Sequence, residues 1–366
     1  MSQLLEKYFA VVKNIITLNK SVSCVGLDIG VDSCKLIELI GTDDSFEVLK
    51  WGIEPIDGAN AQASVQKLFQ RLEIHPKNPV TAVFGKGTII RYIDMPRMPL
   101  NDLKKSFDIE ADKYFPFSRE QIYTDAYILD PKSKEKQMSV LVAAVKKDII
   151  NDRIKFLANL GCSANFVGLN AVATANVFNI LRPSPVNGVN GVNAEPSSLN
   201  PSPPTSVTAI LDMGETVSNL SILVNGVPRF TRDIFVGGQD LTKRISSALT
   251  ISIPEAQKLK CQPNNRIQEI FTICDSVLHN LVSEVKLSFD YFTTERNMHV
   301  SKLFLTGGSC LLEGMPDFFT KSLDVTIERW NPFASLKLAG NISSEEIARS
   351  ACFLTVALGL SLYQYD

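Results

Sequence analysis

Several residue types and patterns that commonly indicate function are scarce in this sequence. Its 366 residues include only 3 histidines and 2 tryptophans, and 37 Lys plus Arg nearly balance 39 Asp plus Glu. General nucleic-acid binding normally needs a strong positive field, so we expect no nucleic-acid partner. The 7 cysteines are scattered and contain no Cys-x-x-Cys pair. This argues against a disulfide framework or a zinc site and favours a reducing cytoplasm.

Long apolar runs are missing as well. No stretch of about 18 uncharged apolar residues occurs, and Glu6 and Lys7 interrupt the apolar N-terminal stretch. We therefore expect neither a transmembrane helix nor a signal peptide. With 45% hydrophobic and 21% charged residues, the chain has enough core-forming sequence for roughly two domains.

Two segments differ in composition from the rest. Residues 182–206 are rich in Pro, Asn, Ser and Gly, a composition that buries too little apolar surface to order itself, so we expect a flexible linker between two halves. Residues 1–21 carry apolar side chains at helical spacing. This amphipathic segment is expected to pack on its own domain, with docking on a partner or on a membrane as alternatives.

The same motif occurs on both sides of that linker: an apolar strand followed by Asp-x-Gly. Placing Asp28 over Asp212 gives an offset of 184 residues. At this offset the identical pairs are Leu27/Leu211, Asp28/Asp212, Gly30/Gly214, Leu36/Leu220 and Leu39/Leu223. The repetition predicts an internal duplication.

Paired Asp-x-Gly turns suit a phosphate ligand. Gly30 and Gly214 would let the backbone approach a phosphate closely, with turn N–H groups facing it. Asp28 and Asp212 cannot contact phosphate favourably, so they would act through a divalent cation and its waters. Each turn taken alone could be an ordinary β-turn, but their duplication favours one nucleotide gripped from both sides.

Hydrophobic periodicity predicts two α/β halves and an insertion. The expected strands are at 22–28, 36–40, 46–51 and 80–84 in the first half, and at 207–212, 220–224, 228–234 and 302–306 in the second. The expected helices include 61–72 and a long one at 266–296. Residues 88–160 predict a strand, a helix, two strands and a helix, which is the pattern of a small inserted subdomain.

The ordered motifs resemble the actin-like ATPase superfamily, and within it the type IV pilus assembly proteins of the PilM family, relatives of the cell-division protein FtsA. The matching motifs are Asp28-Ile29-Gly30, Met95-Pro96-Arg97-Met98-Pro99, Glu110-Ala111-Asp112-Lys113-Tyr114-Phe115-Pro116-Phe117, Asp212-Met213-Gly214, Gly237-Gly238 and Thr306-Gly307-Gly308-Ser309. The resemblance runs from about residue 22 to the end, apart from the linker.

This resemblance implies an α/β protein with the actin-like ATPase fold: duplicated ribonuclease-H-like subdomains with two inserted subdomains. The implied boundaries are 22–87 and 161–181 with the C-terminal helix 345–366 for the first subdomain, 88–160 for a small α/β insertion, 207–236 and 300–344 for the second subdomain, and 237–299 for a helical insertion.

The resemblance also implies that ATP and Mg²⁺ bind in the cleft, with Asp28 and Asp212 reaching the metal through water. The nucleotide-binding residues that carry over are Asp28, Gly30, Ser33, Lys35, Asp212, Gly214, Ser218, Glu284, Ser288, Gly307, Gly308 and Ser309. No catalytic residue can be named from the sequence.

Some positions depart from the family pattern. Val31 and Asp32 stand where relatives commonly carry Ser or Thr, and Leu287 stands where many have Arg. Near the strand that connects the halves many members carry acidic residues, whereas this chain has Gly168 and Asn170, and an amide cannot act as a general base. The site is therefore better equipped to hold ATP than to hydrolyse it.

The function implied by the family is that of a cytoplasmic scaffold at the inner face of the inner membrane. Such a protein binds the cytoplasmic N-terminal peptide of the inner-membrane protein PilN, in a groove that involves the inserted subdomain, and so reaches other inner-membrane and motor components of the pilus. Membrane association would come only through partners, and self-association stays open. The alternatives are an active ATPase that cycles between nucleotide states and an FtsA-like filament-forming protein.

Overall fold

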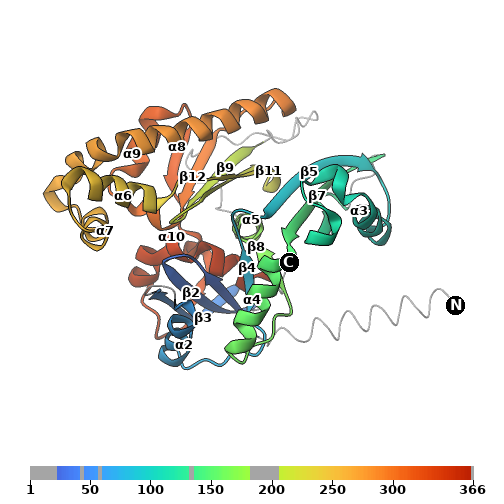
Figure 1. Cartoon of the computed structure of the whole chain (residues 1–366), viewed down its shortest axis with the longest axis horizontal. Helices are drawn as coiled ribbons and strands as arrows, with labels where there is room; N and C mark the ends of the chain where they lie inside the picture. The colour runs from blue at the N-terminus through green and yellow to red at the C-terminus, as the bar shows by residue number, and fades with distance from the viewer. Residues whose placement is uncertain (1–22, 42–44, 57–59, 132–135, 182–205, 364–366) are drawn as a thin grey trace, which may run out of the picture.

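The computed structural model describes residues 23–41, 45–56, 60–131, 136–181 and 206–363. The expectations for residues 1–21 lie outside this part, as do nearly all of those for 182–206. Three sheets organise the described residues, and Figure 1 shows them as a lower body, an upper body and a lobe to one side.

A six-stranded sheet with the order β14-β3-β2-β1-β4-β8 forms the centre of the first half. Its strands are β1 (Cys24–Ile29), β2 (Ser33–Gly41), β3 (Phe46–Pro55), β4 (Val80–Val83), β8 (Val167–Leu169) and β14 (Lys337–Leu338). Helices α2 (Ala61–Arg71) and α4 (Lys147–Asn159) share a core with one side of β1, and α5 (Asn170–Ile180) and α10 (Ser344–Ser361) cover the other. Every residue of β1 is buried, as expected for a strand covered on both faces.

The second half repeats this arrangement. Its five-stranded sheet has the order β11-β10-β9-β12-β13, so an antiparallel meander is again followed by a parallel strand beside its first member. The strands are β9 (Val207–Met213), β10 (Ser218–Val224), β11 (Val227–Ile234), β12 (Lys302–Thr306) and β13 (Thr326–Arg329). The shared topology agrees with the duplication predicted from the sequence.

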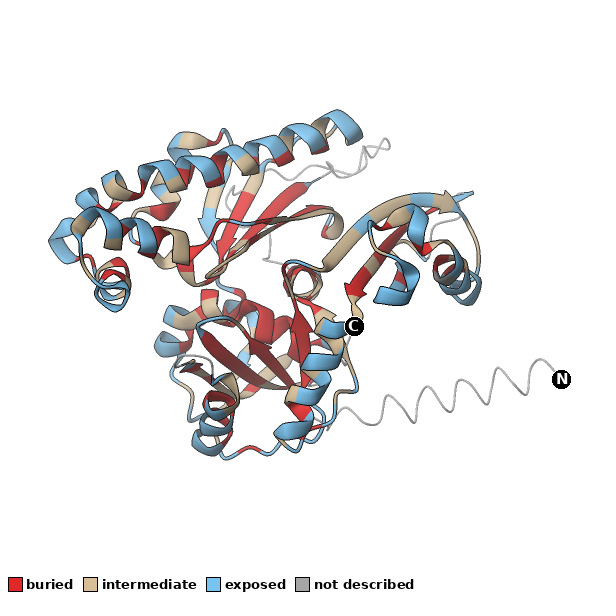
Figure 2. Ribbon diagram, in the orientation of Figure 1, coloured by how far each residue is buried: buried red, intermediate tan, exposed pale blue. Residues whose placement is uncertain are grey.

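Helices cover this second sheet, and Figure 2 shows their outer faces as exposed and the strands as largely buried. They are α6 (Gly238–Leu249), α7 (Ile253–Cys261), α8 (Ile267–Arg296) and α9 (Met315–Ser322). Residues of α8 at helical spacing, among them Ile270, Cys274 and Leu278, are buried in one core with residues of β9 and β12. The apolar stripe explains why the hydrophobic periodicity of the sequence predicts a helix of this length.

The third sheet belongs to the insertion. Strands β5 (Thr88–Pro96), β6 (Ile122–Ile128) and β7 (Gln137–Lys146) pair antiparallel in the order β5-β7-β6. Helix α3 (Leu100–Tyr114) buries Leu103, Phe107 and Ala111 against one face of this sheet. The insertion therefore has a core of its own.

Helix α10 packs on α5 and β1 through close backbone contacts. A Cβ atom at Gly359 would lie 2.0 Å from the carbonyl oxygen of Ala173 in α5, and one at Gly26 in β1 would lie 2.1 Å from the carbonyl oxygen of Ala357. Only glycine permits such an approach. None of the helices in the described ranges combines the length and apolarity needed to cross a membrane.

Candidate functional site

The two Asp-x-Gly turns have the same backbone geometry. The Gly30 N–H donates to the carbonyl oxygen of Ser33 at 3.0 Å, and the Gly214 N–H donates to that of Val217 at 3.1 Å. Both turns close the hairpin between the first two strands of a sheet. The offset of 184 residues found in the sequence therefore relates two equivalent structural positions.

Each aspartate faces an equivalent neighbour across its hairpin. Asp28 pairs in register with Lys35, and Asp212 pairs with Asn219. The Lys35 ammonium lies 3.4 Å from an Asp28 carboxylate oxygen, and both side chains are about nine-tenths buried. Antiparallel pairing brings opposite charges together in this way without any long-range contact.

Charge in the cleft is unevenly compensated. Burial, and then the carboxylate of Asp28, raises the pKa of Asp212 to about 7, against the opposing effect of Lys35. Burial acts to lower the pKa of Lys35, but the carboxylates of Asp28 and Asp32 outweigh it and the net shift is upward. Lys35 pairs with Asp28, and a further cation beside Asp212 would stabilise its ionised form.

A cavity of about 370 Å³ lies between the two turns. This volume is within the range of small-molecule sites. Its lining includes Asp28, Gly30, Lys35, Asp212, Gly214, Gly307 and Gly308 among the residues named from the sequence. The structure therefore brings seven of those residues together around one space.

The Gly-Gly turn after β12 closes one side of this cavity. Gly307 has φ +82°, and a Cβ atom there would lie 2.5 Å from the Asp212 Oδ1 atom and from the Met213 backbone nitrogen. Any other residue would be strained and would displace the carboxylate. The Ser309 hydroxyl donates to the Gly214 carbonyl oxygen at 3.1 Å, which joins the Gly-Gly turn to the second Asp-x-Gly turn. Among the described residues, Ser309 is not part of the cavity lining.

The other residues named from the sequence lie behind the lining. The Ser33 hydroxyl donates to Asp32 at 2.9 Å, and the Ser218 hydroxyl donates to the Val236 carbonyl oxygen at 2.7 Å and is fully buried. Glu284 and Ser288 on α8 both bind the guanidinium of one residue of β11, at 2.5 and 3.3 Å.

That guanidinium belongs to Arg232, which does line the cavity, together with Arg91 and Asp233. These three residues were not found by motif matching. A polar side chain within a strand was their only sequence signal, and many strands share it. Burial raises the pKa of Asp233, although a hydrogen bond from Asn219 at 2.6 Å opposes the shift.

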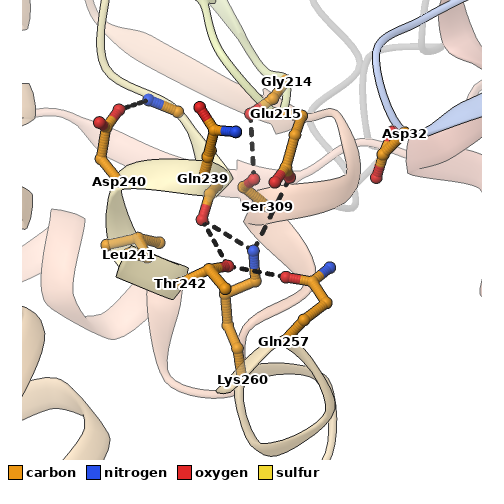
Figure 3. Close-up of polar contacts among 12 residues, drawn as sticks. Asp32, Gly214, Glu215, Gln239, Asp240, Leu241, Thr242, Gln257, Lys260 and Ser309 are labelled. Carbon is orange, nitrogen blue, oxygen red and sulfur yellow. Dashed lines mark hydrogen bonds and ion pairs between the residues drawn. The ribbon is translucent and has the colours of Figure 1, made fainter. Parts of the chain in front are cut away.

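A buried lysine network holds α6 and α7 onto the second turn, as Figure 3 shows. The Lys260 ammonium donates to the Gly238 carbonyl oxygen at 2.8 Å and lies 3.8 Å from a Glu215 carboxylate oxygen. The Thr242 hydroxyl lies within hydrogen-bonding distance of the Gly238 carbonyl oxygen and of Gln257. Burial raises the pKa of Glu215, with Lys260 opposing and Asp32 adding to the shift.

One cavity-lining group has an unsatisfied polar atom. The Asn170 Oδ1 atom, at the start of α5, is buried with no hydrogen-bond partner among the described residues. Such an atom usually awaits a water or a ligand. The described residues contain no cluster of three or more His, Cys, Asp or Glu side chains able to hold a metal ion.

Comparison with known proteins identifies this architecture. The family model described as type IV pilus assembly protein PilM matches residues 26–365. The chain belongs to the PilM family. A solved structure described as the PilM-PilN type IV pilus biogenesis complex contains a chain that superposes on this PilM family member with a TM-score of 0.80. The identity is 22%, and the match covers 94% of this chain and 99% of the other.

A second relative is the cell division protein FtsA of Bacillus subtilis (strain 168). It is 24% identical to this PilM family member over 281 residues, which is 67% of this chain but only 59% of FtsA. The family match and the fold likeness together confirm the actin-like ATPase fold that the sequence motifs predict.

Proposed function

We propose that this PilM family member is an ATP-binding scaffold for type IV pilus assembly. The observation that carries the proposal is the convergence of two equivalent Asp-x-Gly turns and one Gly-Gly turn on a single cavity. Backbone N–H groups of glycine turns are well suited to bind phosphate oxygens. Lys35, inside the cleft, supplies the cation closest to the carboxylate pair.

Asp28 and Asp212 would hold Mg²⁺ through water. Burial and the Asp28 carboxylate raise the pKa of Asp212, and a divalent ion beside the pair would favour its ionised form. Bound Mg²⁺ would neutralise part of the phosphate charge. Ser33, Ser218, Ser309, Glu284 and Ser288 would support the site from behind by holding its turns and Arg232 in place.

Retention of ATP is favoured over turnover. Asn170 lies in the cavity lining, and an amide cannot accept a proton from water as a general base would. Asp32 adds a further negative charge to the lining, which makes binding of a triphosphate depend on a cation. We therefore favour a scaffold over the alternatives of a cycling ATPase or a filament-forming protein.

The partner we propose is the cytoplasmic N-terminal peptide of a PilN-like inner-membrane protein, and the likeness of this fold to a chain of a PilM-PilN complex supports a PilN-like partner. On the inserted sheet, Tyr123 and Tyr127 of β6 are exposed, and so is Ile154 of α4. The Tyr123 hydroxyl reaches Asn151 of α4 at 3.4 Å, so β6 and α4 adjoin there. An extended peptide could bury these side chains, and the protein would then act at the inner face of the membrane through its partner.

Calorimetric titration of Mg-ATP into nucleotide-free protein tests the nucleotide part, followed by chromatography of the same sample after several hours. We expect micromolar or tighter binding, intact ATP, and loss of binding in Asp212→Asn. Asp317→Asn, an exposed carboxylate on α9, is the matched control and should bind normally. Conversion to ADP would support a cycling ATPase. Absence of binding would leave a platform that works without nucleotide.

A synthetic peptide copying the N-terminus of the PilN-like protein tests the partner part. Tyr127→Ala should weaken its binding at least tenfold. Tyr291→Ala, on α8 and equally exposed, should leave it unchanged because it lies in the second half of the fold. Equal affinities in the two variants would refute the assigned surface.

A further inference from the structure

One strand of the insertion also contacts the second half of the fold. Tyr92 and Asp94 lie two residues apart in β5, so their side chains point to the same side of the strand. The Tyr92 hydroxyl is 2.9 Å from the Thr231 hydroxyl in β11. An Asp94 carboxylate oxygen accepts a hydrogen bond at 3.0 Å from Arg296, the last residue of α8. Figure 1 shows β5 running up to β11 from the side lobe.

The two contacts differ in character. The Tyr92–Thr231 contact is partly buried, and burial raises the pKa of the Tyr92 phenol to about 12. The Asp94–Arg296 pair is more open, with 40% and 28% of the two side chains exposed, so its contribution to stability is small. The first contact sets the position of β5, and the second can open at little cost.

The ion pair also has room to rearrange. A cavity of about 280 Å³ adjoins it, lined by Asp94, Ser139, Arg229, Arg296 and Met298 among others. The Arg296 Nε atom is buried without a partner in the described part of the chain. Asp130 also lines this cavity and offers a second carboxylate. Because one Arg296 nitrogen has no partner and free volume lies beside it, its contacts do not hold the side chain in one arrangement.

The contacts lead directly to the nucleotide cavity. Thr231 lines it, and so does the following residue, Arg232. Ile90 and Arg91 of β5, the two residues that precede Tyr92, line the same cavity from the other side. A ligand in this space therefore touches both strands that the hydroxyl pair connects.

We infer that Tyr92–Thr231 and Asp94–Arg296 form a clamp that couples occupancy of the nucleotide cavity to the position of the inserted subdomain. A ligand shifts such an equilibrium only if it contacts the two arrangements differently, and the cavity satisfies this because β5 and β11 each supply part of its lining. The inference rests on the proposed function. It adds that nucleotide regulates the peptide site on β6 and α4 through β5.

The test measures peptide affinity with and without Mg-ATP, and ATP affinity with and without peptide. In the wild-type protein each ligand should change the other's affinity by the same factor, between about 5 and 150. In the double variant Tyr92→Phe, Asp94→Asn the factor should fall to near 1, while each ligand alone still binds. Glu110→Gln is the matched control, because its ion pair with Lys113 lies wholly within the insertion.

Hydrogen exchange supplies an independent readout. Mg-ATP should slow exchange of the β5 amides in the wild type and in Glu110→Gln, but not in the double variant, whose thermal midpoint shows whether it is folded. Binding of both ligands with an unchanged coupling factor in the folded double variant would overturn the clamp alone. A wild-type factor of 1 would do the same. Failure of the wild type to bind Mg-ATP would overturn the proposed function and the coupling with it.

Discussion

Replacement of Asp212 by asparagine should stabilise the protein while it abolishes nucleotide binding. The pKa of this carboxyl rises from its ordinary value of 3.8 to about 7 in the folded state. The folded protein therefore binds the proton more tightly than the unfolded chain, and the free energy of unfolding falls as pH rises from about 4 to about 7. A rise of roughly 3 pH units corresponds to about 4 kcal/mol as an upper limit.

The observed gain should be smaller, because Asp212 is partly open to the cavity and Lys35 offsets part of the repulsion. We expect Asp212→Asn to exceed the wild type by about 1–3 kcal/mol at pH 8 and by little near pH 4. Urea unfolding at several pH values between these limits measures the difference, with the exposed Asp317→Asn as control. Parallel stability profiles for the wild type and Asp212→Asn would refute the argument that the buried carboxylate pair is under strain.

Three further substitutions test the packing. Gly359→Ala should lower the unfolding free energy by about 1–3 kcal/mol through overpacking against α5, and thermal melts should show no such loss for Gly340→Ala, whose Cβ would meet open space. Phe107→Ala should cost about 3–5 kcal/mol in the core of the insertion, and hydrogen exchange should place the loss in β5 to β7. Ser218→Ala leaves the Val236 carbonyl without its donor and should cost about 1–3 kcal/mol in urea unfolding, with less effect on Mg-ATP affinity than Asp212→Asn.

Local patterns were enough to predict the central strands of both halves, helices α2 and α8 and the two turns, but they did not predict α7, α9, β13 or β14. Strand and helix periodicity depends on burial of nearby residues, and the duplicated Asp-x-Gly motif marks equivalent hairpins that need no distant partner. For this reason Asp28, Gly30, Asp212 and Gly214 lie together around the cavity, as the sequence indicates.

The direction of a side chain was harder to predict. Ser218 and Asn219 are neighbours in β10, and alternation along a strand sends them to opposite faces. Motif matching selected the serine, but the structure buries it against the Val236 carbonyl and places Asn219 in the cavity lining. The identity of the residues did not determine which of the two faces the cleft.

Contacts between distant segments left no signal in the sequence. Arg232 and Glu284 are 52 positions apart, and the Lys260 ammonium donates to the carbonyl oxygen of Gly238, 22 positions earlier. Each pair depends on how α7 or α8 packs on the second sheet, and helix periodicity does not determine that packing. Such pairs, and with them the charged lining of the cavity, become visible only in the folded chain.

The close packing of α10 has a consequence for biosynthesis. The Leu360 carbonyl oxygen lies 4.0 Å from the Cys24 sulfur, across a separation of 336 residues. At ribosomal rates of 5–20 residues per second, the first strand waits roughly half a minute for the helix that covers it. During that interval one face of the first sheet has no helix α10 to bury it. We expect the nascent chain to need shielding from aggregation until α10 leaves the ribosome.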